Sequence, residues 1–327
     1  MRTQLVLPFL IVIFGLSETA RADIDGAPRA GETPEIGDVS VKAPSPPADQ
    51  ELAGNSLNVF ISHHATTHYA NTTTTGNFAR WRGGKQSICP ITEGLSPGYN
   101  AFITARIRAL AVYVGAPVAS DPQCKSNVQI RFTNSPLEKM DSVVKWATAP
   151  AFHNRYAGGG RDLIAFKSDH AIQGWYLVTG GDSAVLSTDV ALVGFSVQPI
   201  WPQVEQNYAG SNATGTRVGG ASGTGSGIGV VILVVDTTRV VGYSIGTIAD
   251  YLAMLTMSVA QSPDHCDPLP SILDLMSISC GAREKPIAIT ASDLAFLKAL
   301  YYKNTGLGPS PSRSAIEDNM MRQFKLP

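Results

Sequence analysis

The strongest chemical motif in the sequence is GYSIG at residues 242–246, in which Ser244 lies between two glycines. In serine hydrolases such a G-x-S-x-G turn exposes a nucleophile, because the glycines let a strand turn tightly into a helix. The serine also needs a histidine base. His265 is the only histidine that follows it, and the remaining chain is short for the further elements of that fold. Hydrolysis by Ser244 with His265 is therefore our alternative, and a simple helix cap at Ser244 is preferred.

Asp250 is the second candidate, because it lies on a helical segment that is otherwise almost wholly apolar. A carboxylate removed from water is costly unless it is paired. Its place in the first helical turn would let backbone N–H groups and the helix dipole stabilise it, and Thr247 with Asp250 has the spacing of a capping box. We expect a structural carboxylate, with a catalytic acid beside Ser244 as the alternative.

Three histidines, His63, His64 and His68, cluster next to a threonine-rich segment. Imidazole is a common metal ligand, so metal capture is one hypothesis for this cluster. The spacing matches no standard site, however, and no acidic residue or cysteine lies nearby in the sequence. We prefer the interpretation that these are solvated loop histidines.

Two further segments have the composition of anion sites. The glycine-rich segment 217–229 lacks G-x-G-x-x-G and precedes a strand, which argues against a phosphate-binding loop and favours a flexible loop. Arg80-Trp81-Arg82 could bind an anion, although such cations more often lie on a solvated strand edge. We therefore expect no cofactor.

A central strand and helix must position Ser244 and Asp250. Residues 229–235 form a short β-branched apolar run, which predicts a strand buried on both faces and is too short to span a bilayer. Apolar residues then recur with helical spacing at positions 248, 252, 255 and 259. Since the opposite face of this helix is also apolar, we expect it to lie at the centre of the fold.

The other elements surround this centre. Predicted strands cover residues 56–62, 127–133 and 189–200. Predicted helices begin at Ser96, at Ser135 and at a capping box from Thr290 to Asp293, and residues 170–178 also fit a helix. The expected fold is α+β or α/β, with a mixed sheet and packed helices.

The chain begins with a signal-peptide pattern, in which a basic residue precedes an apolar run and an A-x-A site at residues 20–22. An uncleaved membrane anchor is less favoured, because the run is shorter than the ~20 residues of a span. The expected divisions are a signal peptide (1–22), a Pro/Ala-rich disordered linker (23–55), one main domain (56–305) and a ragged tail (306–327). We expect no transmembrane segment after cleavage.

Composition narrows the function classes further. The formal net charge of −1 argues against a nucleic-acid surface. The four cysteines are an even number, which suits disulfides in an oxidising compartment, so we expect a secreted or periplasmic protein. Three connectivities are open, and the simplest is local pairing of Cys89 with Cys124 and of Cys266 with Cys280.

The C-terminal part, TIADYLAMLTMSV followed by PSILDLM and ITASDLAFLKALY, resembles the end of a zincin metallopeptidase. In that family a helix bearing H-E-x-x-H is followed by a methionine-containing turn and a last helix. Here Ala249, Asp250 and Ala253 occupy the places of the first histidine, the glutamate and the second histidine, and Val259 the place of a third. Alanine and valine have no lone pairs for zinc, so the resemblance implies a scaffold without its metal. The segments RWRG and ADYLAM are also similar to exported bacterial proteins of unknown function.

These observations favour a non-catalytic protein. A complete core without a complete catalytic set predicts a pseudoenzyme on a degenerate zincin-like scaffold. We expect it to bind an envelope partner or a peptide, along an exposed sheet edge.

Overall fold

The computed structural model of the protein describes residues 50–65, 78–84, 86–121, 123–147, 170–179, 227–260, 266–281, 285–302 and 311–324. A four-stranded sheet has the order β1-β2-β4-β3. Its strands are β1 (Pro90–Glu93), β2 (Val128–Thr133), β3 (Ile172–Thr179) and β4 (Gly227–Asp236). β1 and β4 run parallel to β2, whereas β3 is antiparallel to β4. The expected mixed sheet is confirmed.

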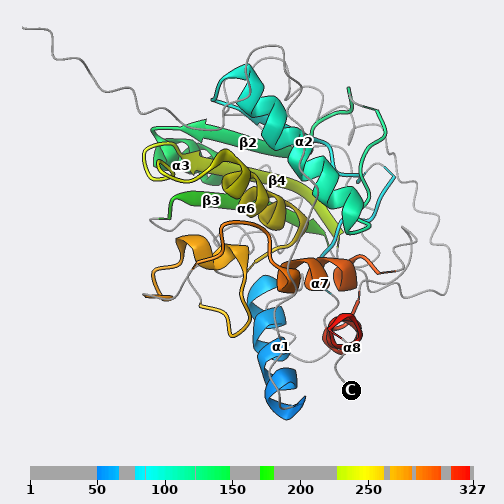
Figure 1. Cartoon of the computed structure of the whole chain (residues 1–327). Coiled ribbons are helices and arrows are strands. Elements are labelled where there is room, and N and C mark those ends of the chain that lie inside the picture. The colour runs from blue at the N-terminus through cyan, green and yellow to red at the C-terminus, as the bar shows by residue number, and fades with distance from the viewer. Residues whose placement is uncertain are drawn as a thin grey trace, which may run out of the picture.

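Six α-helices pack around this sheet in the described part of the chain (Figure 1). They are α1 (Gln50–His64), α2 (Pro97–Tyr113), α3 (Pro136–Ala147), α6 (Ile245–Met257), α7 (Ala291–Leu300) and α8 (Arg313–Gln323), and a 3-10 helix, η1 (Ile272–Met276), precedes α7. α2 and α6 lie side by side across one face of the sheet, and α3 packs against β3 and β4 (Figure 1). Among the described helices none is long and apolar enough to cross a membrane.

The predicted centre is confirmed. β4 is buried along nearly its whole length because it lies between two strands and beneath helices. α6 is buried from Thr247 to Met257, which its all-round apolar sequence predicts. The predicted strand at 127–133 and the helices beginning near residues 96, 135 and 290 are also present.

The C-terminal end of α6 is buried, so its last carbonyls cannot bond to water. Ser258 donates its backbone N–H and its hydroxyl to the Met254 carbonyl. The next three carbonyls receive donors from other elements: Leu255 from the Tyr176 hydroxyl (3.0 Å), Thr256 from the Trp81 indole (2.8 Å) and Met257 from the Tyr301 hydroxyl (2.7 Å). The pre-sheet segment, β3 and α7 are therefore joined to one helix end.

This arrangement corrects the interpretation of Arg80-Trp81-Arg82 as a solvated edge. Trp81 is fully buried, and the Arg80 side chain, also buried, donates to the Leu300 carbonyl at 3.2 Å. The segment belongs to the core and carries part of the cap on α6.

Two predicted elements have the wrong type. Residues 56–62 were expected to be a strand but belong to α1, because Leu57, Phe60, Ile61 and His64 form one buried helical face. The expected linker therefore ends before Gln50 and not at residue 55. Residues 170–178 were expected to be helical, but β3 occupies Ile172–Thr179. A short apolar run fits both the helical and the strand periodicity, and residues 172–179 form a strand because they pair with β4.

The expected ragged tail contains a helix, α8, that packs against α1 and α7. Ile316 and Met320 are fully buried, which accounts for its docking. The main domain therefore extends beyond residue 305. The signal peptide, the strand expected at 189–200 and most of the loop 217–229 lie outside the described residues; residues 227–229 begin β4.

Both expected disulfides are confirmed, Cys89–Cys124 and Cys266–Cys280. The first joins the start of β1 to the segment before β2. The second closes the loop that carries η1.

Removing a hydroxyl from the cap on α6 should destabilise the fold. Tyr176→Phe and Tyr301→Phe each leave a buried carbonyl without its donor, so the free energy of unfolding should fall by about 1–3 kcal/mol. Urea unfolding followed by circular dichroism measures this. Tyr113→Phe changes a tyrosine that is 46% exposed and should alter the value by less than about 0.5 kcal/mol. Similar losses in all three variants would contradict the capping role.

Candidate functional site

Asp250 lies in the interior of the protein and is held by two other elements. Arg106 of α2 donates its Nε to Asp250 Oδ1 at 2.7 Å and a second guanidinium nitrogen to Oδ2 at 3.3 Å. The backbone N–H of Ile289, just before α7, donates to Oδ2 at 3.0 Å. Both oxygens are thus occupied by donors, and the carboxylate joins α2 to α6 and to the start of α7.

Ser244 is the N-cap of α6. Its hydroxyl oxygen accepts the Thr247 backbone N–H at 3.1 Å, so the predicted cap is confirmed. The capping box expected from Thr247 to Asp250 does not form, because Ser244 is the N-cap and Thr247 lies inside the first turn of α6; the Thr247 hydroxyl donates to the Ile287 carbonyl at 2.6 Å. β4 ends at Asp236 and turns follow it, so no strand leads tightly into the helix at Ser244. His265 lies outside the described residues.

The histidines at the end of α1 contact protein groups. His63 Nδ1 lies 2.6 Å from a carboxylate oxygen of Asp267. His64 is buried, with Nδ1 2.9 Å from the Phe60 carbonyl and Nε2 2.8 Å from the Ser271 hydroxyl. Neither is a solvated loop histidine, which corrects that expectation; His68 lies outside the described residues. With both nitrogens in protein contacts, His64 is poorly placed to bind a metal.

His64 begins a buried chain of polar groups. Ser271 Oγ also lies 2.7 Å from Asp293 Oδ1 and accepts the Leu273 N–H at 3.1 Å. Because a carbonyl only accepts, His64 Nδ1 must donate to Phe60, and a neutral ring then offers Nε2 as an acceptor. The single Ser271 hydrogen can serve His64 or Asp293 but not both. The three hydrogen bonds that join Phe60, His64, Ser271 and Asp293 can form at the same time only when these groups carry one extra proton, either on His64 Nε2 or on Asp293.

The environment assigns that proton to Asp293. Burial raises the pKa of Asp293 from 3.8 to about 6, although hydrogen bonds from Ile272, Thr290 and Ser271 oppose the rise. Burial lowers the pKa of His64 from 6.5 to about 3, while its bond to the Phe60 carbonyl opposes the fall. Below about pH 6, protonated Asp293 donates to Ser271, which donates to His64. Above it, Ser271 donates to ionised Asp293 and the contact with His64 loses its hydrogen.

Two capping boxes position the hydrogen-bonded groups His64, Ser271 and Asp293. Thr290 and Asp293 form the predicted box at the start of α7, which is confirmed. Ser271 and Asp274 form a second one at η1, which the sequence interpretation missed although S-x-x-D is its signature. Asp293 also accepts the Ile272 N–H at 2.8 Å, so its carboxylate connects the box at α7 to the start of η1.

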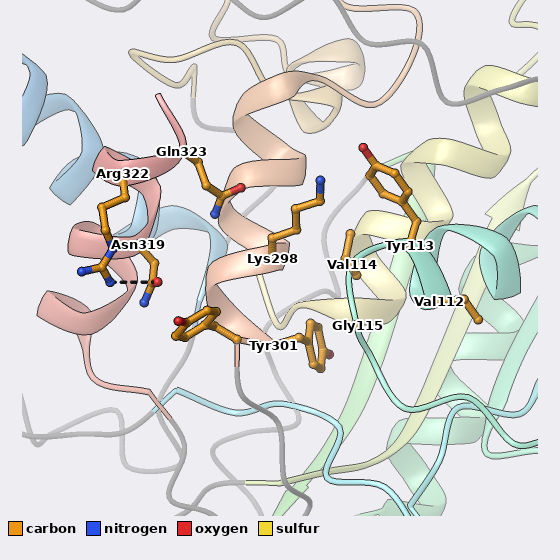
Figure 2. A pocket seen from close by; sticks show the side chains of 10 residues that line it. Val112, Tyr113, Val114, Gly115, Lys298, Tyr301, Asn319, Arg322 and Gln323 are labelled. Atoms are coloured by element: carbon orange, nitrogen blue, oxygen red, sulfur yellow. Dashed lines mark hydrogen bonds between the residues drawn. The ribbon is translucent and has the colours of Figure 1, made fainter. Parts of the chain in front are cut away.

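A pocket at the helix ends was not predicted from the sequence. A cavity of about 640 Å³ lies where the last turns of α2, α7 and α8 meet (Figure 2). It is lined by Val112, Tyr113, Val114, Gly115, Lys298, Tyr301, Tyr302, Asn319, Arg322 and Gln323. Lys298 Nζ lies 4.2 Å above the Tyr113 ring, and Arg322 donates to Asn319 Oδ1 at 2.9 Å. No periodic signal marks these residues, because the pocket exists only once α8 has docked.

No family model, curated protein or solved structure matches this chain. The site must therefore be interpreted from its own geometry.

Breaking the pair of Arg106 and Asp250 should be strongly destabilising. Asp250→Asn leaves a largely buried guanidinium without its carboxylate, and Arg106→Gln leaves the reverse, so each should lower the free energy of unfolding by about 3–5 kcal/mol. The double variant should lose clearly less than the sum, because neither charge then remains unpaired. Urea unfolding of all four proteins gives the coupling energy, and strict additivity would contradict a direct pair.

The chain from His64 to Asp293 predicts opposite pH dependence in two variants. Between about pH 4 and pH 6 these two side chains together bind one proton in either state, on Asp293 when the protein is folded and on His64 when it is unfolded. The pair therefore does not change the free energy of unfolding with pH in this range. His64→Gln removes the side chain that binds the proton in the unfolded protein. The free energy of unfolding should then fall by about 3 kcal/mol more than in wild type as pH rises through this window.

Asp293→Asn leaves only the histidine, which is neutral when folded and protonated when unfolded. Its free energy of unfolding should therefore rise with pH over the same window, relative to wild type. Unfolding curves at several pH values test both signs, and parallel pH profiles in the two variants would contradict the shared proton.

Proposed function

We propose that this protein is a non-catalytic binding protein of the cell envelope, built on a zincin-like scaffold that lacks a metal site. The observation that carries the proposal is the state of Asp250. It is the only carboxylate on α6, and its oxygens accept hydrogen bonds from Arg106 and Ile289. A general base needs an oxygen that can reach a metal-bound water, whereas this carboxylate ties three elements together.

The positions that would hold zinc support the same conclusion. Ala249 and Ala253 are fully buried methyl groups on α6, and Val259 beyond its end is 6% exposed. These side chains offer no lone pair, and their burial leaves substrate no path to this face of the helix. In the proposed scaffold, apolar core residues therefore occupy the positions where a zincin has its zinc ligands.

The order of elements supports the zincin-like part of the proposal. α6 is followed by η1, which packs against it and ends at Met276, and then by α7 with its capping box. This is the order of central helix, methionine-containing turn and last helix on which the resemblance rests.

The binding part of the proposal rests on the pocket and on the disulfides. Two disulfides are consistent with an oxidising compartment outside the cytoplasm. We propose the pocket, and not the β3 edge of the sheet, as the contact with the envelope partner, because residues 171–176 at that edge are buried.

A serine hydrolase remains the second candidate, since the Ser244 side chain is exposed. Its hydroxyl is a helix cap and lies 2.8 Å from the Thr247 hydroxyl, so activation would require a base to displace that contact. Metal sequestration by His63, His64 and His68 is the third hypothesis.

Two measurements on the full chain test the proposal. After incubation with zinc and gel filtration, elemental analysis should find far less than one zinc ion per chain. A fluorophosphonate probe should label the wild type no more than Ser244→Ala, because an unactivated serine does not react.

The controls separate the alternatives. Stoichiometric zinc that is lost in Asp250→Ala would overturn the metal-free scaffold, and zinc lost in His63→Ala would support sequestration. Labelling that disappears in Ser244→Ala would establish the hydrolase instead.

A further inference from the structure

Four large apolar side chains are exposed on two loops, the turn before α6 (residues 237–244) and the segment between η1 and α7 (residues 277–290). They are Val241 (75% exposed) and Tyr243 (37%) in the first loop, and Ile278 (85%) and Ile287 (76%) in the second. Side chains this far out of the surface contribute little to the core. Exposed apolar residues that gather in one place mark interaction sites, so the relative position of the two loops matters.

Hydrogen bonds join the two loops. The Thr247 hydroxyl lies 2.8 Å from the Ser244 hydroxyl and donates to the Ile287 carbonyl at 2.6 Å, so the turn before α6 lies beside the segment before α7. Lys285 donates its Nζ to the Ser277 carbonyl at 2.8 Å, which holds the two limbs of the second loop together. Figure 1 shows the turn before α6 and η1 on the same side of the molecule. We call the surface that carries the four apolar side chains the loop face.

Basic side chains accompany the apolar ones. Arg239 precedes Val241 by two positions, and Lys285 precedes Ile287 by two positions. Among the described residues of the two loops there is no aspartate or glutamate. The amino-terminal end of α6 also begins here, and its dipole adds a partial positive charge.

The acidic residues next to these loops do not cancel that charge. Asp236 ends β4 just before the first loop, and its Oδ1 accepts hydrogen bonds from the backbone and hydroxyl of Thr238. Glu284 lies outside the described residues and follows Arg283 in the sequence, so the formal charges of these two balance. The loop face therefore keeps a positive net charge, which is complementary to an anionic surface.

Apolar side chains on loops beside basic ones match the surface of a lipid bilayer. Lipids rearrange around a side chain that enters the headgroup layer, so such a contact needs no preformed groove on either side. Tyr243 suits that layer because its ring is apolar and its hydroxyl is polar. Lysine and arginine suit it as well, because their stems are apolar while their charged ends reach lipid phosphates.

We propose that the loop face binds an anionic lipid bilayer. Val241, Ile278 and Ile287 enter the headgroup layer, and Arg239 and Lys285 contact lipid phosphates. This inference goes beyond the proposed function, because it gives the protein a position on a membrane. α7 begins beside the loop face and ends at the pocket, so its ten residues hold the pocket up to about 15 Å farther from the bilayer. A partner can then occupy the pocket while the protein is bound to lipid.

Hydrogen exchange of the full chain, measured by mass spectrometry with and without vesicles, tests the proposal. Vesicles of phosphatidylcholine and phosphatidylglycerol in equal parts should slow amide exchange in residues 238–246 and 277–289 and leave residues 112–115, at the pocket, unchanged. Because exchange is resolved along the chain, binding through any other segment is recognised. Vesicles of phosphatidylcholine alone should need about tenfold more lipid for the same protection, since each basic side chain near an anionic surface strengthens binding severalfold.

Two double variants separate the loop face from apolar exposure in general. Ile278→Ser/Ile287→Ser should raise the lipid concentration at half protection about tenfold, because two apolar side chains no longer leave water. Val112→Ser/Tyr302→Ser is the matched control, since it removes two exposed apolar side chains at the pocket and should leave that concentration unchanged. Thermal unfolding of each variant checks that the fold is intact.

Unchanged exchange of the loop face in anionic vesicles would overturn the proposal, as would equal effects of the two double variants. Protection without lipid that increases with protein concentration would assign the loop face to a second copy of the chain and would also overturn it. These outcomes leave the zinc and fluorophosphonate tests untouched, so the failure of each proposal is separately visible.

Discussion

The buried C-terminal end of α6 is the constraint on which the rest of the structure depends. A helix that ends inside a protein leaves carbonyls that water cannot reach, and each must find a donor elsewhere. Here the donors are Tyr176 of β3, Trp81 before the sheet and Tyr301 at the end of α7. Three segments that are distant along the chain therefore have one fixed position relative to α6. Asp250 imposes a similar constraint near the other end of the helix through Arg106 and Ile289.

Under the proposed function, these two sets of contacts explain why the central helix serves the structure and not catalysis. An active-site helix must leave lone pairs or protons available to a substrate. The Asp250 carboxylate and the last carbonyls of α6 instead accept hydrogen bonds from neighbouring elements, and Ala249 and Ala253 are buried methyl groups on the same helix. Under the same proposal, binding takes place at the pocket where the ends of α2, α7 and α8 meet.

Local signals in the sequence predicted the central part of the fold. β4 and α6 could be recognised because a β-branched run and an all-round apolar helix have few alternatives, and the two disulfides follow from the simplest pairing. α1 and β3 were mistaken because short apolar runs fit both periodicities. The caps on α6 could not be predicted, since Trp81 bonds a carbonyl 175 positions away. The same is true of the contact between His64 and Ser271, which are 207 positions apart.

The contact between the first and last described helices affects the order of folding. Arg313 of α8 donates to the backbone carbonyl and side-chain oxygen of Asn58 in α1, 255 positions earlier, and Phe78 donates its N–H to the Pro311 carbonyl. During synthesis α1 emerges from the ribosome long before α8, the helix that packs against it. A nascent chain therefore cannot form the contact between these two helices until α8 has left the ribosome.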